Sequence, residues 1–182
     1  MALQLFTFGH GTAGRDELAE LLRGAGIERV VDVRRFPGSR RNEAASRGQI
    51  AELCAELGIE YRWDERLGGR RSLDAEQDAA SPDKWWRIKA FRAYAAWTRG
   101  PEFAAAMIEL IDGLPQASTA VMCSESVWWR CHRRIIADVA VMLHGVEVIH
   151  LLPGGRRSTH EPSAGARIED GQLIWDGADD AC

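Results

Sequence analysis

Short runs of apolar residues recur along the chain, separated by longer segments with a helical spacing of apolar positions. Most of the runs are continuously apolar rather than alternating, which is typical of strands covered on both faces. They predict strands at Gln4–Gly9, Arg29–Val33, Glu60–Trp63, Thr119–Cys123 and Glu147–Leu151. A further candidate strand near the end of the sequence is Gln172–Trp175.

The segments between these strands carry apolar side chains at intervals of three and four residues, which predicts amphipathic helices. The predicted helices are Arg15–Ala25, Ser46–Leu57, Pro101–Gly113 and Trp128–His144, and a further helix contains Trp86, Ala90, Tyr94 and Trp97. Glycines 26, 58 and 145 follow three of these helices, where a left-handed cap favours glycine. The polar, irregular segment Gly68–Lys84 predicts a long loop, and such loops often act as functional lids.

The alternation of strand and helix predicts an α/β fold: a single three-layer domain with a mostly parallel central sheet flanked by helices. The domain is expected to cover residues 1–176, and residues 177–182 are expected to form a frayed tail. In such sheets, ligands bind beyond the carboxyl ends of the strands. Functional residues are therefore expected at the strand ends.

The composition is that of a globular protein, with 46% hydrophobic and 27% charged residues among 182. A net charge of -4 argues against a protein wrapped wholesale on nucleic acid, although it permits a local basic patch. The four cysteines (Cys54, Cys123, Cys131 and Cys182) show no disulfide framework, and the N-terminus shows no signal peptide. No run approaches the roughly 20 apolar residues of a membrane span. We therefore expect a cytoplasmic protein with free cysteines and no membrane partner.

The first predicted strand ends in the sequence Phe8-Gly9-His10-Gly11-Thr12, directly before a helix. Glycines allow backbone amides to approach a ligand, and a helix N-terminus favours an anion. Gly9, His10 and Gly11 are therefore candidate anion-binding residues. The alternative is that a tight turn between strand and helix simply needs glycine.

The second predicted strand leads into a segment with four arginines within eight residues. Asp32 and Arg34 are two residues apart, so both point to the same side of the strand and are predicted to pair. The planar Arg34 guanidinium matches the oxygens of phosphate or carboxylate, and Ser39 offers a hydroxyl. The alternative is a solvated basic loop.

The fourth predicted strand ends at Cys123, and the following segment carries Glu125, Arg130, His132 and Arg133. A cysteine at a strand exit, near a helix N-terminus and guanidinium groups, is placed for a lowered thiol pKa and nucleophilic attack. Glu125 opposes that shift by its charge, or is itself the general acid or base. His132 is a candidate proton shuttle or anion ligand, and Arg130 and Arg133 are candidate anion ligands.

Alternatives remain for these residues. Cys123 is also compatible with a purely buried role, Cys131 lies on the apolar stripe of its helix, and His132 is compatible with a partly buried structural role. Cys123, Glu125, Cys131 and His132 could form a zinc site, but they lack the closely spaced cysteine pair typical of structural zinc. We therefore predict no metal and no cofactor.

Several motifs resemble those of the bacterial and archaeal domain-of-unknown-function 488 family. They are Phe8-Gly9-His10, Asp32-Val33-Arg34 with Pro37 and Ser39, Leu67-Gly68-Gly69, Phe91-Arg92-Ala93-Tyr94, and Cys123-Ser124-Glu125 through Trp129-Arg130-Cys131-His132-Arg133. The segment 160–165 is less like the usual ending of the family. The resemblance implies an α/β sandwich with a mostly parallel sheet, and it implies no particular activity.

The leading hypothesis is an enzyme, a transferase or hydrolase, that acts on a small anionic substrate: phosphorylated, a nucleotide or derived from nucleic acid. Arg34 and Arg133 would clamp the anion, Cys123 or Glu125 would act chemically, and Asp32 would orient Arg34 or His10. The first alternative is a non-catalytic module for nucleic acid or nucleotide, with a basic face formed by Arg34, Arg35, Arg40, Arg41, Arg70, Arg71, Arg156 and Arg157. The second is a metal or redox protein that uses the thiols. The sequence does not predict an oligomeric state.

Overall fold

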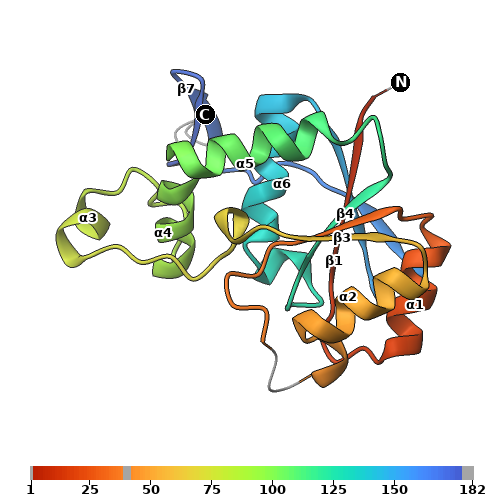
Figure 1. Cartoon of the computed structure of the whole chain (residues 1–182). Coiled ribbons are helices and arrows are strands. Elements are labelled where there is room, and N and C mark those ends of the chain that lie inside the picture. Colours follow the sequence, from red (N-terminus) through yellow and green to blue (C-terminus); the bar gives the residue numbers. More distant parts are fainter. Residues whose placement is uncertain (1, 39–41, 178–182) are drawn as a thin grey trace.

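A computed structural model describes residues 2–38 and 42–177 of the chain (Figure 1). Its central sheet has the strand order β3-β2-β4-β1-β5-β6, and the strands from β3 to β5 run parallel. The edge strand β6 is antiparallel to β5. The strands are β1 (Gln4–Gly9), β2 (Arg29–Asp32), β3 (Glu60–Trp63), β4 (Thr119–Cys123), β5 (Glu147–Leu151) and β6 (Arg157–Thr159). The predicted α/β fold with a mostly parallel sheet is confirmed.

Helices cover both faces of this sheet (Figure 1). One face is covered by α1 (Arg15–Gly24) and α2 (Arg47–Glu56), and the other by α5 (Pro101–Asp112) and α6 (Arg133–His144). Helix α4 (Lys89–Thr98) lies beside this second layer, in contact with α5. The described chain also contains the short helix α3 (Ala75–Ala80) and a separate hairpin of β7 (Ala166–Glu169) and β8 (Gln172–Trp175). Short 3-10 turns are η1 (Glu43–Ala45), η2 (Glu65–Leu67), η3 (Trp128–Arg130) and η4 (Pro153–Gly155).

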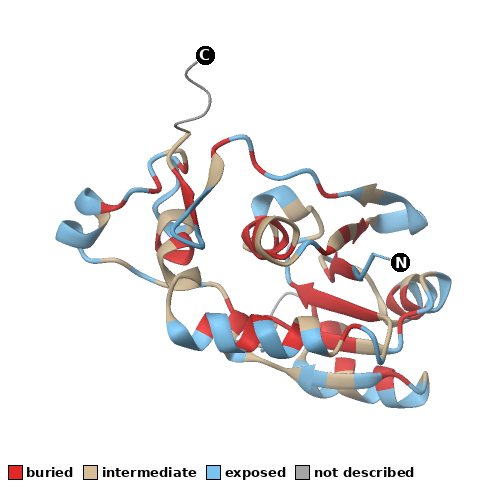
Figure 2. Cartoon of the chain, turned by 90° about the horizontal axis from the view of Figure 1, so that it is seen from above, coloured by how far each residue is buried: buried red, intermediate tan, exposed pale blue. Residues whose placement is uncertain are grey.

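The two faces of the sheet form two hydrophobic cores, because successive side chains of a strand point to opposite sides. Phe6, Phe8 and Met122 belong to the core with α1 and α2, whereas Leu5 and Val121 belong to the core with α5 and α6. Figure 2 shows these buried residues in the central strands and on the helix faces turned towards them. Cys123 lies on the side of α6, which decides its neighbours.

Most element boundaries agree with the sequence patterns to within one residue. The predicted helix through Trp86 and Trp97 is wrong at its start, because α4 begins at Lys89. Strand β2 ends at Asp32 rather than Val33, and glycines 26, 58 and 145 have the expected positive φ. The predicted helix Trp128–His144 is wrong as one element, because it is divided into η3 and α6 with an extended Cys131 between them. The apolar spacing continues through the break, so the pattern did not reveal it.

Several short elements were not predicted. The predicted loop Gly68–Lys84 contains α3, whose Asp74 and Gln77 form a capping box. Strands β6 and β7 are three and four residues long and largely polar, so they lack the apolar signal of the central strands. The domain limit at residue 176 stays a prediction, and most of the predicted tail, residues 178–182, lies outside the described residues.

Within the described ranges, no helix is long and apolar enough to cross a membrane.

The expectation of free cysteines is wrong for Cys123 and Cys131, which are joined as a disulfide. The fold brings them together because Cys123 ends β4 on the side of α6, and Cys131 lies two residues before the first residue of that helix. Cys54 is free and buried, and Cys182 lies outside the described residues.

Candidate functional site

The carboxyl ends of β2, β4 and β1 lie side by side, and backbone hydrogen bonds also join the segments that follow these strands. The amides of His10 and Gly11 donate to the carbonyls of Cys123 and Ser124 at 3.0 and 2.8 Å. On the other side of β4, the amide of Val33 donates to the carbonyl of Met122 at 2.9 Å. The segments around positions 10, 34 and 125 therefore meet at one edge of the sheet.

A hollow of about 240 Å³ opens beside the end of β4, and we call it the arginine hollow. Four arginines and one carboxylate contribute the charges of its wall: Arg34, Arg35, Arg70, Arg130 and Glu125. The rest of the wall is formed by Phe36, Gly69, Ala90, Phe91, Tyr94, Cys123, Ser124, Cys131 and His132. The hollow is positively charged although the whole chain carries a net charge of -4.

The predicted pair of Asp32 and Arg34 is confirmed. The Arg34 guanidinium donates to both carboxylate oxygens of Asp32, from Nε at 2.8 Å and from Nη2 at 2.7 Å. It also donates to the carbonyl of Ala45 at 2.7 Å, and Tyr61 donates its hydroxyl proton to Asp32 at 2.6 Å. Asp32 is fully buried and Arg34 is 5% exposed, so this pair is a rigid, electrically neutral part of the wall.

The other three arginines of the hollow make no ion pair with a described residue. Arg35 donates to the carbonyl of Arg70 at 2.8 Å, and both guanidinium groups lie over the ring of Phe36. Arg70 has a φ of 58°, a left-handed conformation that is uncommon for arginine and is often found at functional sites. Arg130 is exposed at the end of η3. These three cations remain available to a ligand.

His132 and Cys123 have structural contacts at the floor of the hollow. His132 Nε2 lies 2.9 Å from the carbonyl of Val33 and therefore carries the ring proton. Burial lowers the pKa of His132 to about 4, so the ring is neutral at pH 7 and adds no positive charge. Cys123 is only 1% exposed and is bonded to Cys131, so its sulfur is not a free thiolate in this structure.

Arg133 lies beneath the loop that carries Glu125. It is fully buried, and it donates from Nη1 to the hydroxyl oxygen of Thr7 at 3.1 Å and from Nη2 to the carbonyl of Glu125 at 2.5 Å. Its Nε has no hydrogen-bond partner among the described residues. Burial lowers the pKa of Arg133 to about 9, which still leaves the group charged at neutral pH. The structure thus places Arg133 against the main chain of the site rather than in the wall of the hollow.

Gly9 and Gly11 have different consequences for the site. A Cβ on Gly9 would lie 1.6 Å from the carbonyl oxygen of Glu125, so only glycine permits β1 and the Glu125 loop to approach so closely. Gly11 has a φ of 49°, and its amide is already used by Ser124. Ser39 lies outside the described residues.

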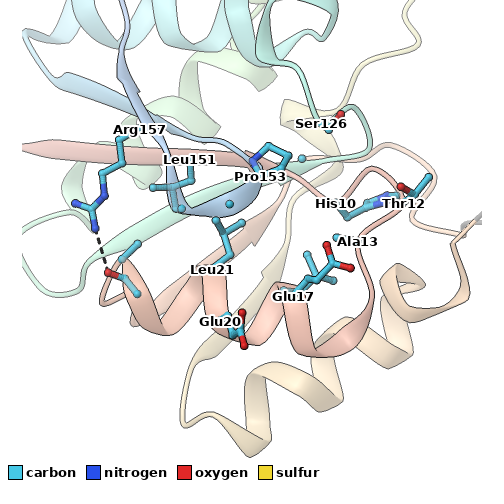
Figure 3. A pocket seen from close by; sticks show the side chains of 16 residues that line it. His10, Thr12, Ala13, Glu17, Glu20, Leu21, Ser126, Leu151, Pro153 and Arg157 are labelled. Atoms are coloured by element: carbon cyan, nitrogen blue, oxygen red, sulfur yellow. Dashed lines mark hydrogen bonds between the residues drawn. The ribbon is translucent and has the colours of Figure 1, made fainter.

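His10 lies on the other side of the Glu125 loop, in a second, larger hollow of about 600 Å³ (Figure 3). Figure 3 shows His10 and Thr12 at one end of this hollow and Leu151 and Arg157 at the other. His10 Nδ1 contacts the carbonyl of Gly11 at 2.9 Å, whereas Nε2 is buried without a partner among the described residues. Burial lowers the pKa of His10, so the ring is mostly neutral at pH 7. His10 therefore does not belong to the arginine hollow, although it adjoins it.

Sequence reasoning missed a group of buried polar residues behind the site: Thr7, Asp138, His150 and His160. Thr7 and His150 interrupt apolar strands, and Asp138 lies within the apolar part of α6. A polar side chain inside an apolar run is costly to bury unless it is paired. The same signal is present at Asp32, and it identifies Thr7, Asp138 and His150 as candidates as well.

Among residues 2–38 and 42–177, no three His, Cys, Asp or Glu side chains are grouped in a way that could hold a metal ion. The four residues considered for zinc do not form such a group. Cys123 and Cys131 are bonded to each other, and His132 Nε2 is used by Val33.

Fold and site together define an α/β protein with a cationic hollow at the carboxyl ends of its parallel strands. A family model described as Domain of unknown function DUF488 matches residues 15–140, and the chain belongs to this family. No curated protein and no solved structure matches the chain. The segments that resemble the family, around Gly9, Arg34, Gly69, Tyr94 and Cys123, all meet at or beside the arginine hollow.

Proposed function

We propose that the chain is an enzyme that binds a small anionic substrate, such as a phosphate ester or nucleotide, in the arginine hollow. The observation that carries the proposal is the charge of the wall, where Arg35, Arg70 and Arg130 are unpaired by any described carboxylate and only Glu125 opposes them. Guanidinium groups bind phosphate oxygens with short, charge-assisted hydrogen bonds. A hydrolase or transferase acting in the cytoplasm fits this arrangement.

In this proposal the three unpaired arginines bind the anion, and the rigid Asp32–Arg34 pair orients the wall. Arg34 offers the anion its remaining N–H donors, since its Nε, Nη1 and Nη2 each already make one hydrogen bond. Ser39 stays a proposed hydroxyl donor. Gly9 and Gly11 shape the site rather than donate to the anion, because the Gly11 amide is already used and the need for glycine at position 9 is steric.

Glu125 is the proposed general acid or base. Its side chain is exposed at the rim of the hollow, while its main chain is held by Arg133. A positioned carboxyl group is a common general acid or base, and its contribution to rate is roughly 100- to 10,000-fold. Cys123 is the weaker candidate for the chemical step because its sulfur is buried and bonded.

Calorimetric titration with inorganic phosphate, and then with a panel of phosphate monoesters and nucleotides, tests this proposal. Arg70→Gln and Arg130→Gln should each weaken binding about tenfold, as expected for loss of one charge-assisted hydrogen bond. The matched control is Arg62→Gln, an exposed arginine paired with Glu60 outside the hollow. Glu125→Gln should abolish turnover but retain binding. Absence of anion binding by the unmodified chain would refute the proposal, and binding without turnover would indicate a non-catalytic module.

A redox function is the second candidate, and the observation that favours it is the bond between Cys123 and Cys131 in the floor of the hollow. In the cytoplasm such a bond is typically transient and catalytic or redox-sensing. Closing it removes two protons and two electrons from the two thiols and passes the electrons to an oxidant, here a small-molecule disulfide such as oxidised glutathione.

Thiol titration of the denatured chain, after equilibration with defined ratios of reduced and oxidised glutathione, checks this candidate. Two thiols should appear as the buffer becomes reducing and disappear when it becomes oxidising. Cys131→Ser should remove this change, whereas Cys54→Ser should retain it, because Cys54 is buried and unpaired. A thiol count that does not change across the series would exclude a redox role.

A further inference from the structure

A continuous line of buried polar side chains runs from Arg133 into the core behind the site. Thr7 on β1 contacts His150 on β5 at 2.6 Å, and His150 contacts His160 at 3.0 Å. His160 contacts Asp138 on α6 at 2.7 Å. All four side chains are buried, so each depends on its neighbours in the line for its hydrogen bonds.

The partners of Asp138 fix the direction of these hydrogen bonds. Asp138 also accepts from the amide of Ser163 at 2.9 Å and from Trp175 Nε1 at 2.8 Å, so both of its carboxylate oxygens act as acceptors. His160 must therefore donate from Nε2, which leaves its Nδ1 to accept from His150 Nε2. His150 Nδ1 then accepts the Thr7 hydroxyl proton, and the Thr7 oxygen accepts from Arg133.

This direction satisfies every group when both histidines are neutral and carry their proton on Nε2. Burial is the main cause that lowers the pKa of His150 to about 2, and the neighbouring His160 and then Arg133 act in the same direction. The line thus connects a buried cation, Arg133, to a buried carboxylate, Asp138. Among the described residues, Arg133 makes no ion pair with an aspartate or glutamate, and Asp138 makes none with a lysine or arginine. Such a connection offsets part of the cost of burying both charges.

The line also contacts the second charged part of the site. The Trp128 ring in η3 stacks on His150, with centroids 4.4 Å apart and an angle of 5° between the rings. It meets His160 edge-on at 5.2 Å. The loop from Ser124 to Arg130 therefore contacts the buried line at both ends. Near its start, the carbonyl of Glu125 accepts from Arg133. Near its end, Trp128 of η3, which ends in Arg130, stacks on His150.

We propose that Thr7, His150, His160 and Asp138 are positioning residues that hold Arg133, and thereby the Glu125 main chain, in the geometry the anion site requires. The expected effect of these residues on ligand binding rests on the proposed function of the arginine hollow. Their expected effect on the geometry of the Glu125 loop does not depend on that function.

Thr7→Val tests the proposal because valine has a similar shape to threonine but no hydroxyl. Thr7→Ser, which keeps the hydroxyl, is the matched control. Thr7→Val should shift the backbone amide resonances of Glu125 and Ser126 and weaken phosphate binding about tenfold, the size of one well-placed hydrogen bond. Thr7→Ser should restore both properties to near those of the unmodified chain, which a general loss of packing would not predict.

The ring ¹⁵N resonances of His150 and His160 in the unmodified chain provide a second measurement, valid even should Thr7→Val fail to fold. His150 should be neutral at pH 7, and both rings should carry a proton on Nε2 and accept a hydrogen bond at Nδ1. A proton on Nδ1 of either ring, or unchanged Glu125 and Ser126 amides in folded Thr7→Val, would overturn the proposal. Absence of phosphate binding by the unmodified chain would instead refute the proposed function, and the amide and ring resonances would still decide the positioning role.

Discussion

Several polar side chains of this protein are buried in its apolar core, and each forms a hydrogen bond with a specific neighbour. Asp32 interrupts an apolar strand and is fully buried with Arg34 and Tyr61 as hydrogen-bond donors. His132 and His150 are held neutral by burial. The energetic consequence differs between the two kinds of residue. The carboxylate is stabilised by its donors, whereas the neutral histidines make the fold sensitive to acid.

Because His132 and His150 are buried as neutral rings, the free energy of unfolding should fall as the pH drops below about 6.5, the ordinary pKa of histidine. The folded pKa is about 4 for His132 and about 2 for His150, so between those values and 6.5 the unfolded chain binds more protons than the folded one. Stability is therefore fully present above pH 6.5 and is lost below it, by about 1.4 kcal/mol per pH unit for each histidine. Urea unfolding should show a loss of about 4 kcal/mol between pH 7.5 and 5.0, with about 2 kcal/mol from each ring.

His132→Gln separates the two contributions. This variant should lose about 2 kcal/mol of the pH dependence. The rest should remain, because His150 still takes up a proton on unfolding in this window, and so do His10 and His144, whose pKa values burial also lowers. An unfolding free energy that is constant between pH 7.5 and 5.0 would contradict the neutral, buried state of both rings.

At the scale of elements, the site is formed by the fit of β1 against the end of β4. The Glu125 loop passes directly over Gly9, and Arg133 at the start of α6 supports the same loop from below. Gly68 and Gly69 play a comparable part for the segment after η2. A Cβ on Gly68 would lie 2.6 Å from the Arg35 amide, and one on Gly69 would lie 3.0 Å from His132 Nδ1. Close approach of a neighbouring backbone explains Gly9 and Gly68, and close approach of the His132 ring explains Gly69.

Gly9→Ala should destabilise the fold by about 3 kcal/mol, at the upper end of the usual cost of overpacking, because the new methyl group would overlap a backbone carbonyl. The Glu125 loop should move, and phosphate binding should weaken with it. Thermal unfolding and phosphate titration check both effects.

Gly48→Ala is the matched control for Gly9→Ala. Gly48 lies within α2, is exposed and has no atom within 4 Å of an added Cβ. Alanine there should stabilise the fold by about 0.5–1 kcal/mol through its higher helix propensity. Equal effects of the two substitutions would show that the contact between Gly9 and the Glu125 loop is absent.

The molecule as a whole separates its charges, since it carries a net charge of -4 but gathers four arginines in one wall at the carboxyl edge of the sheet. The sheet order makes this possible. Strands β2, β4 and β1 are neighbours in the sheet but are distant in sequence, so their ends bring together residues from three separate segments. The C-terminal hairpin, which lies beyond the segment matched by the family model, contributes Trp175 to the carboxylate of Asp138.

Much of this architecture was predictable from local patterns. The central strands and main helices carry a periodic apolar signal, and the pair of Asp32 and Arg34 follows from their spacing on one strand. The short polar elements α3, β6 and β7 carry no such signal, because they are stabilised by capping or pairing rather than by burial of an apolar face. The break before α6 was hidden for the opposite reason, since the apolar spacing continues across it.

The sequence by itself determined the α/β class, the edge of the sheet where the arginine hollow lies and most of the residues that meet there, because periodicity and strand-end position are local properties. Only the tertiary structure decided what each of those residues contacts. It joined Cys123 to Cys131, buried Arg133 beneath Glu125 and separated His10 from the arginine hollow. It also aligned Thr7, His150, His160 and Asp138. Those contacts link residues from separate strands and helices, and their geometry depends on how the layers pack, which no local pattern encodes.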